Sequence, residues 1–436
     1  MTGRRGLQPK GIDRCFDTIP YGRKKWVSGN MTSILCRYPL VVVMKKLLQN
    51  ISIASFSVLA SLAVCEVVAR QVLPPPMQVK VTSTSITPSQ EARFTFESDD
   101  GNINNIIRWG GKNGVRLFPN RTGNIHNHTL SKQDVVIQTN SIGLRGPELG
   151  PKQPGEYRIL LMGDSIIFCD YVDESIAISA LIEQKLKADG IPNVKVLNAG
   201  LPGANTAGEY HHYQEIAAVA QADLVVLAMY LNDAQEPQSF YAKQLRFPFS
   251  RSRFLTWLVQ RLQLLDSDAL FGSVRLPGFE EDWKEKFRAG RKLTSGAYYT
   301  SRDGFDFEIY NAYKDFGLAW NPTSWEQITK ISTAFTEVVK HNGSKFAAFI
   351  FPIAMQVYAN QDILSTYPQQ QFTGLFTKLN VPNMDLLPVL RSYSSKMTKE
   401  EMFYDHCHYR DAGNRIVANA VADWLIKSSL VPAQSR

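Results

Sequence analysis

The sequence predicts an α/β fold in which helices alternate with the strands of a parallel sheet. An apolar run that ends at Met162 is followed at once by a Gly-Asp-Ser turn. Buried parallel strands typically read as such unbroken apolar runs. From Tyr157 onward these runs alternate with helical periods, a pattern typical of βαβ units. The 436 residues, 44% hydrophobic and 20% charged, can also bury a large core.

Positive charge is concentrated at the N-terminus. Residues 1–46 hold ten of the 48 Lys and Arg residues and two of the 40 Asp and Glu residues, which leaves 38 of each kind for the rest. A nucleic-acid groove needs cations clustered on a folded surface, so the neutral remainder disfavours nucleic acid as a partner. We interpret residues 1–46 as a basic cytoplasmic N-terminus whose charge orients the chain in a membrane.

A single transmembrane anchor is predicted at 47–69. The segment Leu47–Val68 is mostly apolar with one acid, Glu66, and about 20 such residues are enough to span a bilayer. Lys45 and Lys46 precede it, so the positive-inside rule places the bulk of the chain in the periplasm or outside the cell. A cleaved signal peptide and a buried amphipathic helix are the alternatives.

The segment before the anchor differs from an ordinary folded region. Residues 1–43 show no hydrophobic periodicity and mix basic residues with turn residues, whereas Met44 and two lysines stand directly before the apolar run. We therefore expect Met44 to be the true translation start, so that 1–43 are not translated. Mass spectrometry of the native N-terminus tests this expectation.

Cysteine usage does not indicate a disulfide framework. The five cysteines are few and irregularly spaced, and only Cys169 and Cys407 follow the anchor. An oxidising compartment would allow these two to pair. Two ordinary buried thiols are the preferred interpretation.

Two regions are expected after the anchor. Residues 77–150 are rich in Thr, Ser, Asn and Gly, with short β-type runs at Ala92–Phe96 and Asp134–Gln138, and predict a small β-rich pre-domain. The turn-dense stretch 140–154 joins this pre-domain to the α/β domain, which we place at 155–428.

The α/β domain is predicted to contain five strands and five main helices. The strands are expected at 157–162, 194–198, 223–229, 345–351 and 384–387, and the helices at 175–188, 205–220, 323–341, 359–378 and 411–426. An insertion at 234–320, rich in aromatic and charged residues, interrupts the alternation. It either covers the site or is a surface excursion without a role in specificity.

Four turns carry the residues that could perform chemistry. Three of them follow strands and the fourth precedes the last helix: 163–165, 198–205, 230–233 and 405–408. Taken alone each turn is weak evidence, since Gly-Asp-Ser is a common turn in which Ser165 would serve as a helix N-cap. Their order and their positions at strand ends, where α/β sheets hold their sites, are the stronger evidence.

These four blocks resemble those of the SGNH hydrolases, the GDSL-type branch of esterases and lipases. The resemblance extends over Tyr157–Leu425, and the insertion has no counterpart in the minimal family pattern. It implies an SGNH-hydrolase-like three-layer α/β/α sandwich around a central parallel sheet. The stretch Asn140–Gly146 is also similar to the lead-in of membrane-anchored bacterial members.

The resemblance implies a catalytic triad of Ser165, His408 and Asp405. A serine hydroxyl is a poor nucleophile until a base removes its proton, and a histidine with a pKa of about 6.5 suits that task. His408 would be the base. A carboxylate three residues earlier, Asp405, can reach the other ring nitrogen and fix the tautomer.

The same resemblance implies an oxyanion hole at Ser165, Gly203 and Asn232. Its donors would be the backbone N–H groups of Ser165 and Gly203 and the side-chain amide of Asn232. Each donor of this kind typically lowers the barrier by roughly 3 to 4 kcal/mol. Gly203 suits the role because no Cβ blocks a substrate from its backbone.

The chain departs from the family pattern at three positions. Tyr230-Leu231 stands where a small glycine is usual before the Asn-Asp pair, and Cys169 stands where a glycine often follows the nucleophile. His406 is a rival base, although the Asp-x-x-His spacing favours His408. The spacing within 406–408 matches no zinc pattern, so neither a metal nor a cofactor is expected.

The sequence therefore predicts a membrane-anchored serine esterase that hydrolyses acyl esters, short-chain or acetyl ones above all. Its partner would be a small-molecule or glycan acyl ester, with envelope carbohydrate or lipid as candidate carriers. An O-acyltransferase acting on polysaccharide would use the same triad, with a sugar hydroxyl in place of water. A catalytically silent carbohydrate-binding protein on this fold is the remaining alternative. The sequence leaves the oligomeric state open.

Overall fold

The computed structural model describes most of the chain after the N-terminus. The described residues are 37–72, 86–109, 114–234, 252–255, 258, 299–312 and 315–432. Most of the insertion 234–320 lies outside them. The chain divides into two units, Met1–Val64 and Cys65–Arg436, which are described separately.

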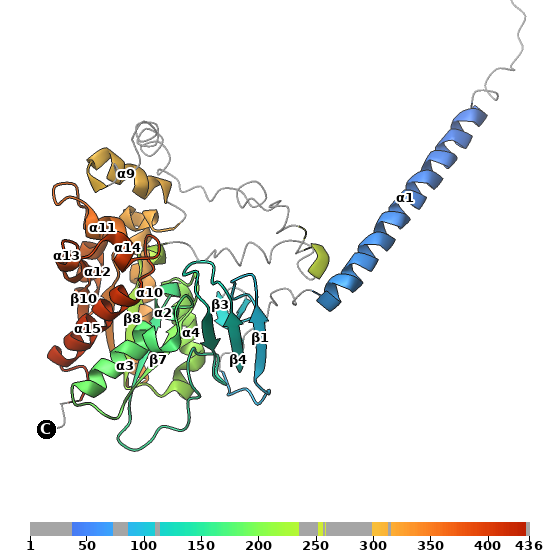
Figure 1. Ribbon diagram of the computed structural model, residues 1–436. Helices are drawn as coiled ribbons and strands as arrows, with labels where there is room; N and C mark the ends of the chain where they lie inside the picture. Colours follow the sequence, from blue (N-terminus) through green and yellow to red (C-terminus); the bar gives the residue numbers. More distant parts are fainter. Residues whose placement is uncertain are drawn as a thin grey trace, which may run out of the picture. The chain divides into compact units, whose positions relative to one another are not determined.

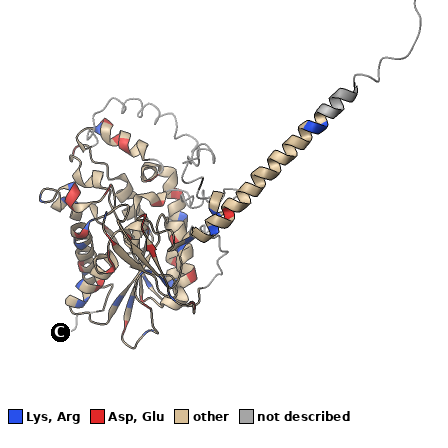
Figure 2. Ribbon diagram, turned by 45° about the vertical axis from the view of Figure 1, so that its right-hand side comes forward, with Lys and Arg blue, Asp and Glu red and all other residues tan. Residues whose placement is uncertain are grey.

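The apolar segment forms one long helix, α1 (Arg37–Val72). Within it, Met44–Val72 is long and apolar enough to cross a membrane, judged by length and composition. The helix contains the predicted anchor 47–69, and its charged residues lie toward its two ends (Figure 2). The side chains of its apolar stretch are almost all exposed, which suits a lipid environment.

A five-stranded parallel sheet forms the centre of the second unit (Figure 1). Its strands are β6 (Tyr157–Gly163), β7 (Val194–Gly200), β8 (Leu224–Met229), β9 (Lys345–Ile350) and β10 (Asn383–Asp385). They run in the order β10-β9-β8-β6-β7, and every pair is parallel. The predicted parallel sheet is confirmed, and each expected strand lies within a few residues of its observed bounds.

Helices cover both faces of this sheet, which confirms the predicted three-layer arrangement (Figure 1). One pair of neighbouring helices is α3 (Ile178–Ala188) with α15 (Asp411–Lys427), and the other is α4 (Thr206–Ala220) with α10 (Pro322–His341). The buried residues of α10 recur at three- to four-residue spacing, from Trp325 through Ile328 to Phe335 and Val339. That spacing presents one apolar stripe to the sheet.

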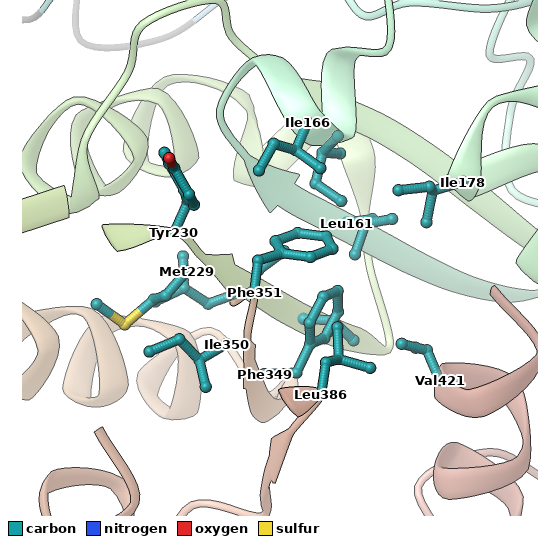
Figure 3. Close-up of a cluster of buried hydrophobic side chains, with 14 of the residues drawn as sticks. Leu161, Ile166, Ile178, Met229, Tyr230, Phe349, Ile350, Phe351, Leu386 and Val421 are labelled. Carbon is teal, nitrogen blue, oxygen red and sulfur yellow. The ribbon is translucent and has the colours of Figure 1, made fainter. Parts of the chain in front are cut away.

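The core between the layers is continuous and apolar. Every residue of β8 is buried, as expected for a central strand covered on both faces. Side chains from different elements meet in it, among them Leu161, Phe349 and Val421 (Figure 3). Each fully buried side chain of this size stabilises the fold by roughly 1.5 to 3 kcal/mol.

Short strands precede the main sheet. A three-stranded sheet joins β1 (Phe94–Ser98), β4 (Arg121–Ile125) and β5 (Val135–Gln138), and a hairpin joins β2 (Ile107–Trp109) to β3 (Val115–Leu117). Their apolar side chains share a second core with Phe168, Leu201 and Ala204 of the α/β region. The β-rich segment therefore packs against two of the loops that follow sheet strands.

One predicted helix begins later than expected. The helix expected at 359–378 is observed as α12 (Tyr367–Lys378), and a separate short helix, α11 (Ala354–Tyr358), ends before the expected start. Pro368 lies in the first turn of α12, where its missing N–H is tolerated, whereas inside one long helix it would remove a hydrogen bond. Among the described residues, further α-helices that the sequence did not predict have four to ten residues: α2 (Ser165–Phe168), α9 (Arg302–Asn311), α13 (Leu387–Tyr393) and α14 (Lys399–Met402).

Candidate active site

The strand order brings three of the four candidate turns to one place. Strand β6 lies between β7 and β8, so the chain leaves β6 toward one side of the sheet and later returns to its other side. Open α/β sheets hold ligands at such a switch point, beyond the carboxyl ends of the strands. Ser165, Gly203 and Asn232 follow the carboxyl ends of β6, β7 and β8, respectively.

The fourth turn supplies a histidine that contacts the serine. His408 Nε2 lies 2.9 Å from Ser165 Oγ, and His408 Nδ1 lies 2.7 Å from Asp405 Oδ2. A hydrogen bond of each length is of ordinary geometry. The structure thus joins the three residues expected to form a triad into one Ser-His-Asp chain, although 243 positions separate Ser165 from His408 in sequence.

Ser165 is free to make this contact because its neighbour caps the helix. Asp164 is the N-cap of α2, and its Oδ1 accepts a hydrogen bond of 2.9 Å from the Ile166 N–H. A carboxylate at this position satisfies an otherwise unpaired backbone donor. Ser165 is therefore the first residue of α2 and not its cap, and its hydroxyl points to His408.

The Asp405 carboxylate stabilises the turn in which it lies. Its Oδ1 accepts hydrogen bonds of 2.8 Å from the backbone N–H groups of Cys407 and His408, while Oδ2 binds the His408 ring. A bridge between Phe403 and Tyr409 closes the loop at its base. The Asp-x-x-His spacing suits this arrangement, because one carboxylate shapes the loop and orients the imidazole that the loop carries.

The surroundings of Asp405 and His408 determine which of the two side chains holds a proton. Burial alone would raise the pKa of Asp405, but the hydrogen bonds from His408 and from two backbone N–H groups hold that pKa well below its ordinary value. Burial favours the neutral form of His408, whereas the Cys407 sulfur and the Asp405 carboxylate favour the charged form and raise its pKa well above 6.5. The carboxylate thus stabilises the imidazolium.

Asn232 is held beside the turn that carries Ser165. Its Nδ2 donates a 3.0 Å hydrogen bond to Asp164 Oδ2, so the carboxylate that caps α2 also fixes the amide. Burial raises the pKa of Asp164 to about 6, although the Ile166 N–H and the nearby His408 oppose the shift. An amide carries two N–H groups, and this hydrogen bond uses one of them.

Gly203 lies in the loop that follows β7, with a φ of +64°. It is exposed, and no heavy atom of the described residues lies within 4 Å of where its Cβ would be. The loop is bonded to the end of strand β6, because the Leu201 N–H donates a 2.9 Å hydrogen bond to Gly163 O. The missing Cβ at an exposed position lets a ligand approach the Gly203 backbone closely.

Two departures from the family pattern are accommodated locally. Cys169 adopts the left-handed conformation, with φ +56° and ψ +37°, and so forms the C-cap that a glycine would form more easily. Tyr230 is buried, and its backbone N–H binds Asp233 Oδ2 at 2.8 Å. Asn232 keeps its contact with Asp164 beside this larger residue. Within the described residues, Cys169 and Cys407 are free thiols.

The rival base is engaged elsewhere. His406 Nε2 lies 2.6 Å from Asp315 Oδ2, and its ring packs against Phe316 at 5.4 Å. Both partners come from the end of the insertion, which the sequence did not link to the site because 91 positions separate Asp315 from His406. The His408 ring has a different neighbour, Tyr171, whose ring stands edge-on to it at 5.1 Å.

A metal would have to compete with these contacts. Donor atoms of Asp405, His406 and Cys407 lie within 4.8 Å of one another. Asp405 already accepts three hydrogen bonds, His406 is paired with Asp315, and the Cys407 sulfur lies 3.5 Å from His408 Nδ1. The donor set therefore favours the Ser-His-Asp chain over a metal centre.

Comparisons with known proteins give similar structures at low sequence identity. LAE5, an alpha/beta hydrolase enzyme from the metagenome of Lake Arreo, Spain, is 11% identical, with a TM-score of 0.36 over 62% of this chain and 94% of its own. Axe2, an acetylxylan esterase from Geobacillus stearothermophilus, is 12% identical, with a TM-score of 0.36 over the same shares. No protein-family model matches the chain, and no curated protein does.

A further similar structure is a member of the lipolytic protein G-D-S-L family from Veillonella parvula DSM 2008. It is 12% identical, with a TM-score of 0.35 over 61% of this chain and 97% of its own.

Proposed function

We propose that the protein is a serine esterase that hydrolyses carboxylic acyl esters. One observation carries the proposal: Ser165 Oγ, His408 and Asp405 form a continuous hydrogen-bonded chain at the switch point of the sheet, with contacts of 2.9 and 2.7 Å. A serine next to a histidine that a carboxylate orients is the arrangement that activates a hydroxyl for acyl transfer.

In the first half of the reaction, Ser165 becomes acylated. His408 Nε2 takes the hydroxyl proton while Oγ attacks the ester carbonyl carbon, which gives a tetrahedral oxyanion. The backbone N–H groups of Ser165 and Gly203 and the amide of Asn232 donate hydrogen bonds to that oxyanion. The C–O bond to the alcohol then breaks, and His408 returns the proton to the departing alcohol.

In the second half, water releases the acyl group. His408 Nε2 accepts a proton from a water molecule whose oxygen attacks the acyl carbon, and the same donors stabilise the second oxyanion. Collapse of that intermediate breaks the bond to Ser165 Oγ, and His408 returns its proton to the serine. Asp405 keeps the ring in the tautomer that accepts at Nε2 and stabilises its charged form.

The proposed substrates are short-chain or acetyl esters on envelope carbohydrate or lipid. The α1 helix supports a membrane anchor, and the lysines at its N-terminal end support a periplasmic or extracellular position for the site. The side chains of His408 and Asp405 are 18% and 30% exposed, so a ligand from solvent can reach them. A surface-bound ester would meet an enzyme confined to the same surface.

The test uses the full chain in detergent micelles. A fluorophosphonate probe is expected to label the wild type, and p-nitrophenyl acetate is expected to be turned over, whereas Ser165→Ala abolishes both. The matched control is Ser175→Ala, which removes an exposed hydroxyl ten positions away and should leave labelling and turnover unchanged. An unlabelled wild type, or a Ser165→Ala variant with wild-type rates, contradicts the proposal.

The same preparation separates hydrolysis from transfer. Sugar acceptors added during turnover compete with water for the acyl-enzyme, and the products are separated by mass spectrometry. Free acid as the main product supports the esterase. Acylated sugar as the main product identifies an O-acyltransferase that uses the same triad.

A further inference from the structure

The guanidinium group of Arg145 binds several groups of the segment that follows Ser165. Its side chain is fully buried. Nη1 donates hydrogen bonds to the carbonyl oxygens of Phe168, at 2.5 Å, and Cys169, and Nη2 donates to Val172 O at 2.6 Å. Nε donates to Glu174 Oε2 at 2.9 Å. All these partners lie just after Ser165 in the chain.

Two of these carbonyl groups, those of Phe168 and Cys169, lie at the end of helix α2, the four-residue helix that begins at Ser165. The last carbonyl groups of any helix have no partner within the helix. A helix this short also has almost no internal hydrogen bonds with which to hold its shape. Its position therefore depends on side chains supplied from outside, and Arg145 supplies the partners of two consecutive carbonyl groups at its C-terminal end.

A second residue completes this support. Asn198, at the end of β7, donates from Nδ2 to Ile167 O at 2.8 Å. The backbone of Arg145 forms a bridge with Asn198, so the two supporting side chains are fixed to each other. Together with the Asp164 cap, they bind α2 at both ends.

The loop that carries Arg145 is itself well determined. Asn140 Oδ1 accepts hydrogen bonds from the backbone N–H groups of Ile142 and Leu144 at 3.2 and 3.0 Å. Gly143 adopts a φ of +77°, and an added Cβ there would lie 3.0 Å from Leu117 O. Asn140 and Gly143 thus shape the turn that precedes Arg145. This turn positions the Arg145 side chain for its contacts.

We propose that Arg145 is a positioning residue for the nucleophile: it holds α2 so that Ser165 Oγ stays within hydrogen-bonding distance of His408. This inference rests on the proposed esterase function. A planar guanidinium group with five N–H donors can serve several carbonyl oxygens and Glu174 at once. A lysine carries the same charge, but its single ammonium group cannot span partners spread along the chain from 168 to 174.

The proposal is tested with Arg145→Lys, Arg145→Ala and a matched control. Arg158→Lys is the control, because Arg158 is equally buried and also donates to backbone carbonyl groups, yet lies near the opposite end of β6 from Ser165. Three quantities are measured for each variant: kcat and KM for p-nitrophenyl acetate, and hydrogen–deuterium exchange of the backbone amides from 166 to 172. Arg145→Ala is measured again with added guanidinium ion.

We expect Arg145→Lys to lower kcat on the order of 10²-fold, as a misplacement of about 1 Å does, with KM within twofold of wild type. Exchange should rise at 166–172 before it rises elsewhere. Guanidinium ion should restore part of the kcat of Arg145→Ala. Arg158→Lys should keep the wild-type kcat.

The proposal is overturned if Arg145→Lys keeps the wild-type kcat, or if exchange at 166–172 stays at the wild-type level. Should both Arg145 variants fail to fold, Glu174→Gln weakens the same contact more gently and must raise exchange in that segment. A wild type without esterase activity refutes the proposed function. The exchange measurement still decides separately whether Arg145 anchors α2.

Discussion

At the scale of single residues, the protonation of His408 decides when the site can act. A general base must be neutral before it accepts the serine proton, so kcat/KM should rise with pH as His408 loses its proton. Burial lowers the pKa of His408, but the Cys407 sulfur and the Asp405 carboxylate outweigh burial and raise it above 6.5. The acid limb of the pH profile should therefore lie above pH 6.5.

Replacing Asp405 by asparagine should impair the base in two ways. The amide cannot hold the ring in the tautomer that accepts at Nε2, so kcat should fall by about 10⁴-fold. Loss of the carboxylate charge also removes stabilisation of the imidazolium, so the pKa of His408 falls and the acid limb of kcat/KM moves to lower pH. Steady-state rates between pH 5 and 9 measure both effects.

The control for this variant is Asp362→Asn, which changes an exposed aspartate on a connecting segment. It should leave kcat and the acid limb where they are in the wild type. An Asp405→Asn variant with the wild-type rate, or with an acid limb at higher pH, contradicts the role given to the carboxylate.

At the scale of elements, α2 depends on how closely it packs against β7. A Cβ added at Gly200, the last residue of β7, would lie 2.2 Å from the Phe168 backbone nitrogen and 2.7 Å from the Ile167 carbonyl carbon. Both atoms are backbone and cannot move aside as a side chain would. The glycine therefore sets the distance between the helix that carries Ser165 and the neighbouring strand.

Gly200→Ala should destabilise the protein and slow its labelling. Overpacking of this kind costs about 1 to 3 kcal/mol in the free energy of unfolding. Because the clash pushes α2 away from the sheet, fluorophosphonate labelling should slow even where the variant remains folded. Thermal melting and labelling rates measure the two effects.

Gly374→Ala is the matched control. Gly374 lies inside α12, where no heavy atom of the described residues comes within 4 Å of an added Cβ. Alanine in a helix interior stabilises by about 0.5 to 1 kcal/mol relative to glycine, so the melting temperature should rise and the labelling rate stay unchanged. Equal melting temperatures for the two variants would argue against the close contact at Gly200.

At the scale of the whole molecule, three buried carboxyl groups lie near one another below the site. Burial raises the pKa of Asp164 to about 6 and that of Asp233 to about 7, and it raises the pKa of Glu209 well above its usual value. Neither carboxyl oxygen of Glu209 has a hydrogen-bond partner among the described residues. In the unfolded chain all three groups ionise near pH 4.

These raised pKa values make the free energy of unfolding depend on pH. Between about pH 4 and 7 the folded protein keeps protons that the unfolded chain releases, so these groups make the free energy of unfolding fall as pH rises. Each pH unit in that window corresponds to about 1.4 kcal/mol for one fully retained proton. Asp405 acts in the opposite direction, since its lowered pKa stabilises the fold above pH 4 and that stabilisation is lost in acid.

Glu209→Gln should raise the melting temperature more at pH 8 than at pH 5. The glutamine amide is uncharged at every pH, so the variant lacks the loss of folding free energy that the buried Glu209 carboxyl group causes at higher pH. Differential scanning fluorimetry at both values measures the difference. Glu326→Gln, on the exposed side of α10, is the control and should give the same small change at pH 5 and pH 8. A Glu209→Gln variant with a lower melting temperature than the wild type at pH 8 would contradict the destabilising role given to the buried Glu209 carboxyl group.

The sequence by itself determined the α/β class and where the strands lie along the chain, and it predicted which residues would form the Ser-His-Asp chain. Apolar runs must be buried, and the resemblance of four short blocks fixed which side chains to examine. The expected helix at 359–378 was placed too early, because the pattern continued through Pro368, whereas proline is tolerated only in the first turn and α12 begins at Tyr367.

Only the tertiary structure decided how these residues act together. It shows that Asp164, and not Ser165, caps α2, and that His406 turns to Asp315 while His408 turns to Ser165. It also brings Arg145 to the carbonyl groups at the end of α2. Such pairings join positions far apart in sequence, and they depend on strand order and packing, which local periodicity does not encode.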